Sequence, residues 1–360
     1  MHINDTIKFM LKLNQRQKLI FDYIRENKGA QNQAIKNYLE KEIEEKISRV
    51  TVVRDLDLLL KNDLIKKNGR GRNVGYTELL TNELLAYFDV ASYFKEDPDN
   101  RKIKYRGFNF NIFTKLNNLF DKLGTEQLDK QNKEYQAKIK KMSPTIIKKE
   151  VERLIIELSW KSSQIEGNTY SLIDTETLIK EHKEAAGHKH VEAIMILNHK
   201  RALDYIFSGK NKFKRLNLRQ VENIHSLIIK DLEVNQGIRK SIVGITGTNY
   251  KPLDNQHQIR EALEKMIAAI NKSKNPLEKA LIANIMIAYI QPFEDGNKRT
   301  SRLLANALLL SHNYCPLSFR SINEGDYKKA VILFYEQNSA LYFKKLFVEQ
   351  FKFSLDNYFR

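Results

Sequence analysis

Apolar residues recur every three or four positions along most of this chain, and this spacing predicts a mainly helical protein. The pattern changes once near the start, where two short apolar runs flank a glycine-containing turn and predict a hairpin. The three expected helices and two expected strands lie at residues 15–25, 34–39, 48–60, 64–67 and 74–77. Together they predict a compact domain over residues 1–80.

The cationic residues of this domain cluster at the start of its third expected helix and along the hairpin. Three helices followed by a basic hairpin resemble a winged helix-turn-helix, which implies a recognition helix that reads bases and a wing that holds phosphates. The residues concerned are Arg49, Thr51 and Arg54 on the helix and Lys66, Lys67, Arg70 and Arg72 on the wing. A domain that mediates only protein contacts is the alternative. The clustering favours nucleic acid, and DNA is the expected partner.

The rest of the chain predicts helices almost throughout. Residues 81–141 form an expected helical connector, with a turn at residues 97–100 and a polar final part that is a loop or an exposed helix. A series of amphipathic helices follows over residues 142–360. The most apolar stretch, residues 277–293, contains Glu278 and other polar positions, so it predicts a core helix and no membrane span.

Composition adds information about partners and compartment. The 360 residues carry a formal net charge of +17, which suggests an anionic partner; a lysine-rich surface that keeps the protein soluble is the alternative. The one cysteine, Cys315, allows no disulfide within the chain and lies among apolar residues, so we expect a buried thiol and a reducing compartment. Residues 1–13 lack the pattern of a signal peptide. We therefore expect a cytoplasmic protein without membrane contact.

Residues 291–302, Gln-Pro-Phe-Glu-Asp-Gly-Asn-Lys-Arg-Thr-Ser-Arg, lie between two apolar helical segments. Gly296 permits a tight turn, after which the free N–H groups at the start of the next helix can bind an anion. Arg299 and Arg302 share one face of that helix, so they add two guanidiniums to the same site. Asp295 supplies the single carboxylate that typically holds Mg²⁺ beside phosphate oxygens. The alternative is a surface turn whose arginines pair with neighbouring acids.

This segment resembles the motif His-x-Phe-x-(Asp/Glu)-Gly-Asn-x-Arg-x-x-Arg of the Fic family, and the resemblance covers roughly residues 81–350. The matching positions are Phe293, Asp295, Gly296, Asn297, Arg299 and Arg302. The resemblance implies a mainly α fold, with an all-helical Fic core over residues 142–360 and a small β-hairpin flap at residues 241–252. An N-terminal winged helix is a common companion of this core.

The resemblance also implies roles for individual residues. Asp295 would hold Mg²⁺, Phe293 would anchor the loop, and ATP would be the substrate or ligand. The residues expected at the nucleotide are Phe293, Gly296, Asn297, Lys298, Arg299 and Arg302, of which Asn297 and Arg299 also belong to the catalytic set. The flap residues that would align the target are Thr246, Gly247, Thr248, Asn249 and Tyr250. The implied reaction transfers AMP from ATP to a hydroxyl of a protein side chain, with pyrophosphate leaving.

Gln291 stands where the family has its catalytic histidine, which removes the proton from the attacking hydroxyl. A glutamine amide takes no proton near neutral pH and can only orient the hydroxyl by hydrogen bonding. His257 and His312 do not have the family's position, and we expect them to be solvated or structural. Three interpretations stay open: a pseudoenzyme that binds nucleotide as a signal, an enzyme with slow or altered chemistry, and an engineered substitution that traps a complex.

A second segment resembles the family's inhibitory motif, (Ser/Thr)-x-x-x-Glu-(Gly/Asn). Ser162, Glu166 and Gly167 match it at the end of an expected helix, residues 143–167, which Ser143 would cap. A carboxylate is unfavourable at the negative end of a helix dipole, so Glu166 needs a cationic partner. The resemblance implies that Arg302 is this partner and that the pair blocks the γ-phosphate position. An exposed glutamate at a fraying helix end is the alternative.

Two functions of different classes follow from these observations. The first is a Fic-type protein adenylyltransferase that Glu166 inhibits and Gln291 impairs, acting on an unidentified target protein or on itself. The second is a DNA-binding regulator that senses nucleotide through a Fic core without catalysis. Removal of AMP from a modified protein ranks last, because it also uses the missing histidine. The sequence leaves the oligomeric state open, with a homodimer among the alternatives.

Overall fold

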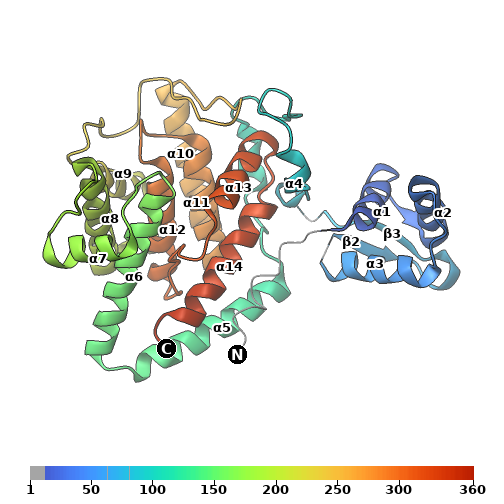
Figure 1. Cartoon of the computed structure of the whole chain (residues 1–360), viewed down its shortest axis with the longest axis horizontal. Helices are drawn as coiled ribbons and strands as arrows, with labels where there is room; N and C mark the ends of the chain where they lie inside the picture. Colours follow the sequence, from blue (N-terminus) through green and yellow to red (C-terminus); the bar gives the residue numbers. More distant parts are fainter. Residues whose placement is uncertain (1–12, 63, 81) are drawn as a thin grey trace. The chain divides into compact units, whose positions relative to one another are not determined.

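The computed structural model describes residues 13–62, 64–80 and 82–360, and it divides into two compact units, Met1–Asp89 and Val90–Arg360. Both units are mainly helical, as the apolar spacing predicts (Figure 1). Across the described ranges, no helix combines the length and the apolarity that crossing a bilayer requires. Residues 1–13, which are predicted not to be a signal peptide, lie outside the described residues except for Leu13.

The first unit contains the three expected helices and the expected hairpin. Its elements are α1 (Gln15–Glu26), β1 (Ala30–Gln31), α2 (Asn32–Ile43), α3 (Arg49–Lys61), β2 (Ile65–Asn68), η1 (Gly71–Asn73), β3 (Gly75–Glu78) and η2 (Glu83–Leu85). The strands form an antiparallel sheet in the order β1-β3-β2, with Tyr76 opposite both Ala30 and Lys67.

Local chemistry accounts for the helix boundaries of this unit. Asn14 and Gln17 form a capping box at the start of α1, and Ser48 caps α3 by accepting a hydrogen bond from the Thr51 N–H. One face of each helix contributes to a shared core that includes Ile24, Leu39 and Leu56. The predicted domain boundary after residue 80 falls short of this unit, which also contains Tyr87 packed edge-on against Phe21.

The second unit is a bundle of helices around one apolar helix. Its elements are α4 (Val90–Tyr93), η3 (Phe110–Lys115), α5 (Lys122–Lys141), α6 (Pro144–Gln164), α7 (Leu172–Glu181), α8 (His190–Ser208), η4 (Lys210–Lys214), α9 (Leu218–Ile228), α10 (Gln256–Lys272), α11 (Pro276–Ile290), α12 (Asn297–Ser311), α13 (Glu324–Gln337) and α14 (Leu341–Asn357). The polar stretch before residue 142 is therefore a helix, one of the two expected alternatives.

Helix α11 forms the centre of this bundle, with its residues from Leu277 to Ile290 all buried. The two charged side chains near its start are matched by nearby groups: Glu278 accepts a hydrogen bond from the Leu119 N–H at 2.7 Å, and Lys279 donates to the Ile270 carbonyl at 2.9 Å. The prediction of a core helix here is confirmed. Helix α12 packs along α11 more extensively than any other helix does, and the loop 291–296 joins the two (Figure 1).

The expected β-hairpin flap is wrong in its secondary structure. Residues 241–252 contain no strand, and the one bridge in this segment pairs Lys251 with Gly107, far upstream in the chain. The backbone groups of the flap bond elsewhere: the Lys251 N–H donates to Arg106, and buried arginine side chains donate to the carbonyls of Ser241 and Gly247. A hairpin ladder is not formed because these long-range bonds take its place.

Candidate functional site

The loop 291–296 connects the end of α11 to the start of α12 through two left-handed residues. Gln291 has φ +50° and Gly296 has φ +78°. A Cβ atom on Gly296 would lie 3.4 Å from Ile229 and 3.6 Å from the His225 ring, which are ordinary contact distances, so the turn favours glycine through its positive φ. The loop shape is therefore set by these two positions.

Two side chains hold the loop from within. The Asn297 amide accepts a hydrogen bond from the Phe293 N–H at 2.9 Å and donates to the Phe293 carbonyl at 2.8 Å. The Phe293 ring is fully buried and stacks on His225 with ring centroids 3.6 Å apart. The predicted anchoring position of Phe293 agrees with this geometry. The side chain of Asn297 is occupied by the loop, so its backbone N–H is the group left to face a ligand.

The first N–H groups of α12 donate no hydrogen bond to a capping side chain, since Gly296 occupies the N-cap. They border a cavity of about 420 Å³. Its walls are the loop 291–296, the first turn of α12, the segment after α6, part of the flap and one face of α13. The lining residues include Glu166, Val243, Thr246, Gln291, Lys298, Tyr327 and Tyr335. An open helix N-terminus that borders a cavity of this size suits a bound anion.

Arg299 and Arg302 lie beneath this N-terminus, and both side chains are almost fully buried. Arg299 donates to Asp295 at 2.9 Å, while its Nη1 group is buried and makes no hydrogen bond among the described residues. Burial lowers the pKa of Arg299, but the guanidinium stays charged in the physiological range. A buried cation with a spare donor is suited to bind phosphate oxygens.

Glu166 is the residue that fills the cationic end of the cavity. Its carboxylate accepts hydrogen bonds from Arg302 at 2.9 Å and from Lys298 at 3.1 Å. Burial raises the pKa of Glu166, but the charges of Arg302 and Lys298 lower it by more, so the pKa lies below its ordinary value. Glu166 follows directly after α6, and Gly167 reverses the chain with φ +99°. The pairing with Arg302 agrees with what the resemblance implies.

Ser162 supports the arginine of this pair. Its Oγ accepts from Arg302 Nε at 2.8 Å, and its carbonyl accepts from Arg302 Nη2 at 2.8 Å. The Ser162 hydroxyl also shares a hydrogen bond with Nε2 of His199 at 2.7 Å, and burial keeps the pKa of His199 well below its usual value. Arg302 is therefore held in place even without Glu166.

Gln291 lines the cavity, and two hydrogen bonds from its amide nitrogen orient its side chain. Its Nε2 donates to the Ala288 carbonyl at 2.7 Å and to the Tyr335 hydroxyl at 3.3 Å. Within the described residues its Oε1 makes no hydrogen bond, so this oxygen is available to accept one from an incoming hydroxyl. The burial of Tyr335 raises its pKa far above the ordinary value, so this tyrosine cannot replace the missing base.

The structure brings only part of the predicted flap set to the cavity. Thr246 lines it. Thr248 donates to Glu336 instead, Asn249 donates to Pro98 and Asp99, and the buried Tyr250 donates to the Tyr289 carbonyl. His257 is exposed at the start of α10 and His312 follows α12, and neither lines the cavity.

Two residues that sequence reasoning missed contribute to the loop. His225 of α9 holds the Asp295 carbonyl at 3.0 Å, and burial lowers its pKa to about 4, so the ring is neutral and donates. Arg239 is buried and donates to the carbonyls of Gln291, Ser241 and Leu253, with the first at 2.7 Å and the second at 2.6 Å. No local signal marks His225, whereas Arg239 lies in the conspicuous Gly-Ile-Arg sequence before the flap.

No metal cluster is preformed in the described part of the chain, since nowhere in it do three His, Cys, Asp or Glu side chains come together. Asp295, the expected Mg²⁺ ligand, has a side chain that is 66% exposed at the edge of the cavity. A single carboxylate of this kind fits a cation that also takes phosphate oxygens and water.

The expected DNA-binding residues of the first unit lie mainly on its surface. Arg49 and Arg54 on α3 and Lys66, Lys67 and Arg70 on the hairpin are exposed, and within the described residues they form no ion pair. Thr51 is half-buried and bonds to Ser48 at 2.8 Å. The side chain of Arg72 lies outside the described residues. The exposed face of α3 also carries Val50, which is 67% exposed.

The fold and the site together define a helical protein in which the open N-terminus of a buried helix borders a cavity. Residues 215–309, which contain α9–α11, the loop and most of α12, match the profile of the Fic/DOC family. Curated relatives named protein adenylyltransferase Fic share 27% identity over 190 residues in Nematostella vectensis and 29% over 180 residues in Aedes aegypti. The matches cover 50% and 48% of this chain but only 43% and 35% of those relatives, so the chain spans less than half of their length.

Solved structures of Fic proteins share this fold. Fic-1 from C. elegans aligns with a TM-score of 0.54 at 17% identity, over 64% of this chain and 69% of that chain. A Fic domain containing signaling protein from Bacteroides thetaiotaomicron aligns with a TM-score of 0.54 at 20% identity, over 64% of this chain and 94% of that chain. Residues 215–309 thus match the model of the Fic/DOC family, and these solved structures share the fold of the region that contains them.

Proposed function

We propose that this chain binds ATP in the cavity beside α12 and is an adenylyltransferase scaffold held inactive by Glu166. The observation that carries the proposal is the carboxylate of Glu166, which bridges Arg302 and Lys298 beside an open helix N-terminus. A carboxylate at that place satisfies cations that a triphosphate would otherwise bind. The name of the curated relatives, protein adenylyltransferase, supports AMP transfer as the reaction.

The residues divide into those that bind phosphate and those that position the reacting groups. The backbone N–H groups of Asn297 and Lys298 and the spare donor of Arg299 would bind phosphate oxygens. Arg302 would bind the terminal phosphate once Glu166 has moved, since Ser162 already fixes its guanidinium. Mg²⁺ would be shared between Asp295 and the phosphates, and it would neutralise charge on the leaving pyrophosphate.

In this reaction the oxygen of a target hydroxyl forms a bond to the α-phosphorus, and the bond from that phosphorus to the bridging oxygen of pyrophosphate breaks. The hydroxyl proton must leave at the same time. Gln291 Oε1 can accept a hydrogen bond from the hydroxyl but cannot remove its proton, which would pass to water. Positioning and charge stabilisation remain, so slow transfer is expected rather than none.

Calorimetric titration of Mg²⁺-ATP into the Glu166→Gly variant tests the proposal. We expect saturable binding to one site, which is lost when Arg299→Gln is added, because the substitution removes a buried cation beneath the helix N-terminus. Mass spectrometry of the same sample should show slow addition of AMP to the protein. Absence of ATP binding to the Glu166→Gly variant would overturn the proposal.

We propose a second function for the first unit, which is DNA binding by a winged helix. The exposed cations at the start of α3 and along the β2–β3 hairpin support it, because they stand where such a domain reads bases and holds phosphates. A gel-shift assay with DNA from upstream of its own gene, with and without ATP, tests it. A complex that forms equally with and without ATP would exclude regulation of DNA binding by nucleotide.

A further inference from the structure

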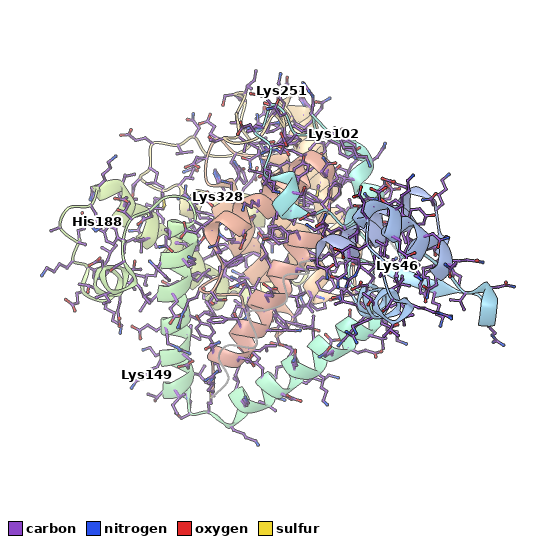
Figure 2. All side chains as sticks on the ribbon, turned by 45° about the vertical axis from the view of Figure 1, so that its right-hand side comes forward. Lys46, Lys102, Lys149, His188, Lys251 and Lys328 are labelled. Carbon is purple, nitrogen blue, oxygen red and sulfur yellow. The ribbon has the colours of Figure 1, made fainter. Side chains whose placement is uncertain are left out.

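The turn at residues 97–100 and the segment after it run along the flap. The Asn249 amide donates to the Pro98 carbonyl at 3.1 Å and to the Asp99 carboxylate at 2.9 Å. Arg101 donates to the Gly247 carbonyl at 2.5 Å, and the Lys251 N–H donates to the Arg106 carbonyl at 2.8 Å. Figure 2 labels Lys102 and Lys251 from these two segments, which lie at the same end of the second unit.

Glu336 of α13 joins this segment to the flap through one buried carboxylate. Its side chain is 0% exposed, and it accepts hydrogen bonds from Arg101 at 2.8 and 3.0 Å, from Tyr93 at 2.7 Å and from Thr248 of the flap at 2.6 Å. Its backbone carbonyl accepts from the N–H groups of residues 104 and 105 at 3.0 and 2.9 Å. Every bond needed by a buried carboxylate is supplied by the upstream segment and the flap.

These contacts divide the flap into two parts with different surroundings. The second part, residues 247–252, is bound by the Arg101–Glu336 pair and by Tyr250, which is buried and stacks on Tyr289 and Tyr335 at 4.9 and 5.2 Å. The first part, residues 243–246, borders the cavity, and Ile242 beside it is 80% exposed. One part of the flap is fixed to the bundle while the other faces the site.

We propose that residues 97–107 and Glu336 form a brace whose task is to position the flap at the mouth of the cavity. The brace lies outside residues 215–309, which match the Fic/DOC profile, so it is a feature of this chain beyond that domain. Arg101, Glu336 and Thr248 are positioning residues: none of them lines the cavity, and each acts through the backbone of the flap. The brace is inferred from the contacts alone. The further idea that the flap receives a protein target rests on the proposed function.

The brace can be tested without nucleotide by following amide hydrogen exchange of Lys251. Its N–H bonds to Arg106, so Thr248→Val does not remove the bond that is measured. Loss of the Thr248 hydroxyl removes its hydrogen bond to the buried Glu336 carboxylate and the bond that it accepts from the Tyr250 N–H at 3.1 Å. We expect exchange at Lys251 to quicken about tenfold to a hundredfold, and the Glu336→Gln variant isolates the contribution of the carboxylate. Thr248→Ser keeps the hydroxyl and should restore the slow rate. Amides of α11 should exchange equally in all three proteins.

Two outcomes of this experiment would overturn the proposal. Unchanged exchange at Lys251 in Thr248→Val would show that the flap does not depend on the brace. Equal acceleration at Lys251 and in α11 would show that Thr248 supports only the global fold. Glu336→Gln keeps the shape of the side chain but loses its charge, and it gives a second measurement at the Lys251 amide. Exchange of this amide at the wild-type rate in Glu336→Gln would also overturn the proposal.

A functional measurement separates positioning from nucleotide binding. In a Glu166→Gly, Gln291→His background, adding Thr248→Val should slow self-labelling with AMP at saturating ATP and leave the ATP dissociation constant unchanged, and Thr248→Ser should recover the rate. A parallel loss of ATP affinity would contradict a positioning role. If ATP does not bind to this background at all, the proposed function fails, while the exchange measurement still decides whether the brace exists.

Discussion

The carboxylate of Glu166 lies 2.9 Å from the guanidinium of Arg302, although the two residues are 136 positions apart in the sequence. Arg302 has no exposed surface, and Lys298 contacts the same carboxylate from the first turn of α12 at 3.1 Å. The carboxylate of Glu166 therefore lies at the positively charged end of the cavity, where a bound anion would otherwise lie. Any anion that uses Arg302 has to displace Glu166 first.

Glu166→Gly should tighten binding of Mg²⁺-ATP by about 5- to 150-fold, the usual range for coupling between two competing groups. The substitution removes the competing carboxylate, while Ser162 keeps the Arg302 guanidinium in position through two hydrogen bonds at 2.8 Å. Calorimetry with the wild type and the variant measures the change. Glu181→Gly, which removes an acid from the end of α7, is the matched control and should bind ATP as the wild type does. Identical affinity in wild type and Glu166→Gly would contradict autoinhibition.

Gln291→His should raise AMP transfer about a hundred- to ten-thousand-fold when Glu166 is also replaced by Gly. The imidazole would stand where the Gln291 amide now faces the cavity, and it can take the proton that glutamine cannot. Incorporation of radiolabelled AMP into the protein, compared between the Glu166→Gly variant and the double variant, gives the ratio. Gln291→Asn in the same background is the control for a change of side chain without a base. A double variant as slow as this control would show that position 291 is not the base position.

The stability of the second unit should fall as the pH is lowered from about 6.5 to about 4. Burial lowers the pKa of His225 to about 4 from its ordinary 6.5, and it also lowers the pKa of the buried His199. Over this window the unfolded chain binds protons that the folded chain does not, so the free energy of unfolding decreases as the pH falls. The decrease due to His225 is about 3 kcal/mol.

Urea unfolding followed by the fluorescence of Trp160, the one tryptophan of the chain, measures this dependence in the second unit. His225→Asn should reduce the slope of stability against pH. The exposed His257→Asn is the control and should leave the slope as it is. If the free energy of unfolding of His225→Asn depends on pH as steeply as that of the wild type, this histidine does not titrate as its burial implies.

DNA binding by the first unit should weaken when the hairpin loses its cations. Replacing Lys66, Lys67 and Arg70 by Ala should lower the affinity at all sequences, and it should reduce the dependence on salt by about one unit of slope for each phosphate contact removed. Fluorescence anisotropy at several salt concentrations measures both effects. The exposed residues Lys130, Lys133 and Lys138 of α5, replaced by Ala together, match the change in net charge. An equal loss of affinity in both triple variants would attribute binding to net charge and not to the hairpin.

The sequence was most informative where local chemistry decides the structure. Ser48 and Ser143 cap the helices that they were expected to cap, and apolar spacing located α11 as a buried helix. The turn between α11 and α12 follows from Gly296, whose positive φ favours glycine. Periodicity and caps act within a few residues, so they can be detected without knowing what lies across the fold.

The flap shows where such reasoning ends. The family resemblance implies a hairpin there, but the flap's backbone groups bond to Arg101 and Arg106 far upstream, and no local pattern identifies these two partners. The same limit applies to His225, which meets Phe293 only because α9 crosses the loop. Sequence reasoning singled out the loop 291–296 and the start of α12 but did not find the groups that hold this loop from other helices.

Gln291 occupies a left-handed backbone conformation that disfavours any side chain beyond glycine by about 1 to 2 kcal/mol. Any residue at position 291 would adopt this conformation, because the turn that leads into α12 requires a positive φ there. Every glutamine codon differs from a histidine codon at one nucleotide. A single point mutation in the gene would therefore place an imidazole on a backbone already bent to carry it, and the family's motif would be complete without any rearrangement of the fold.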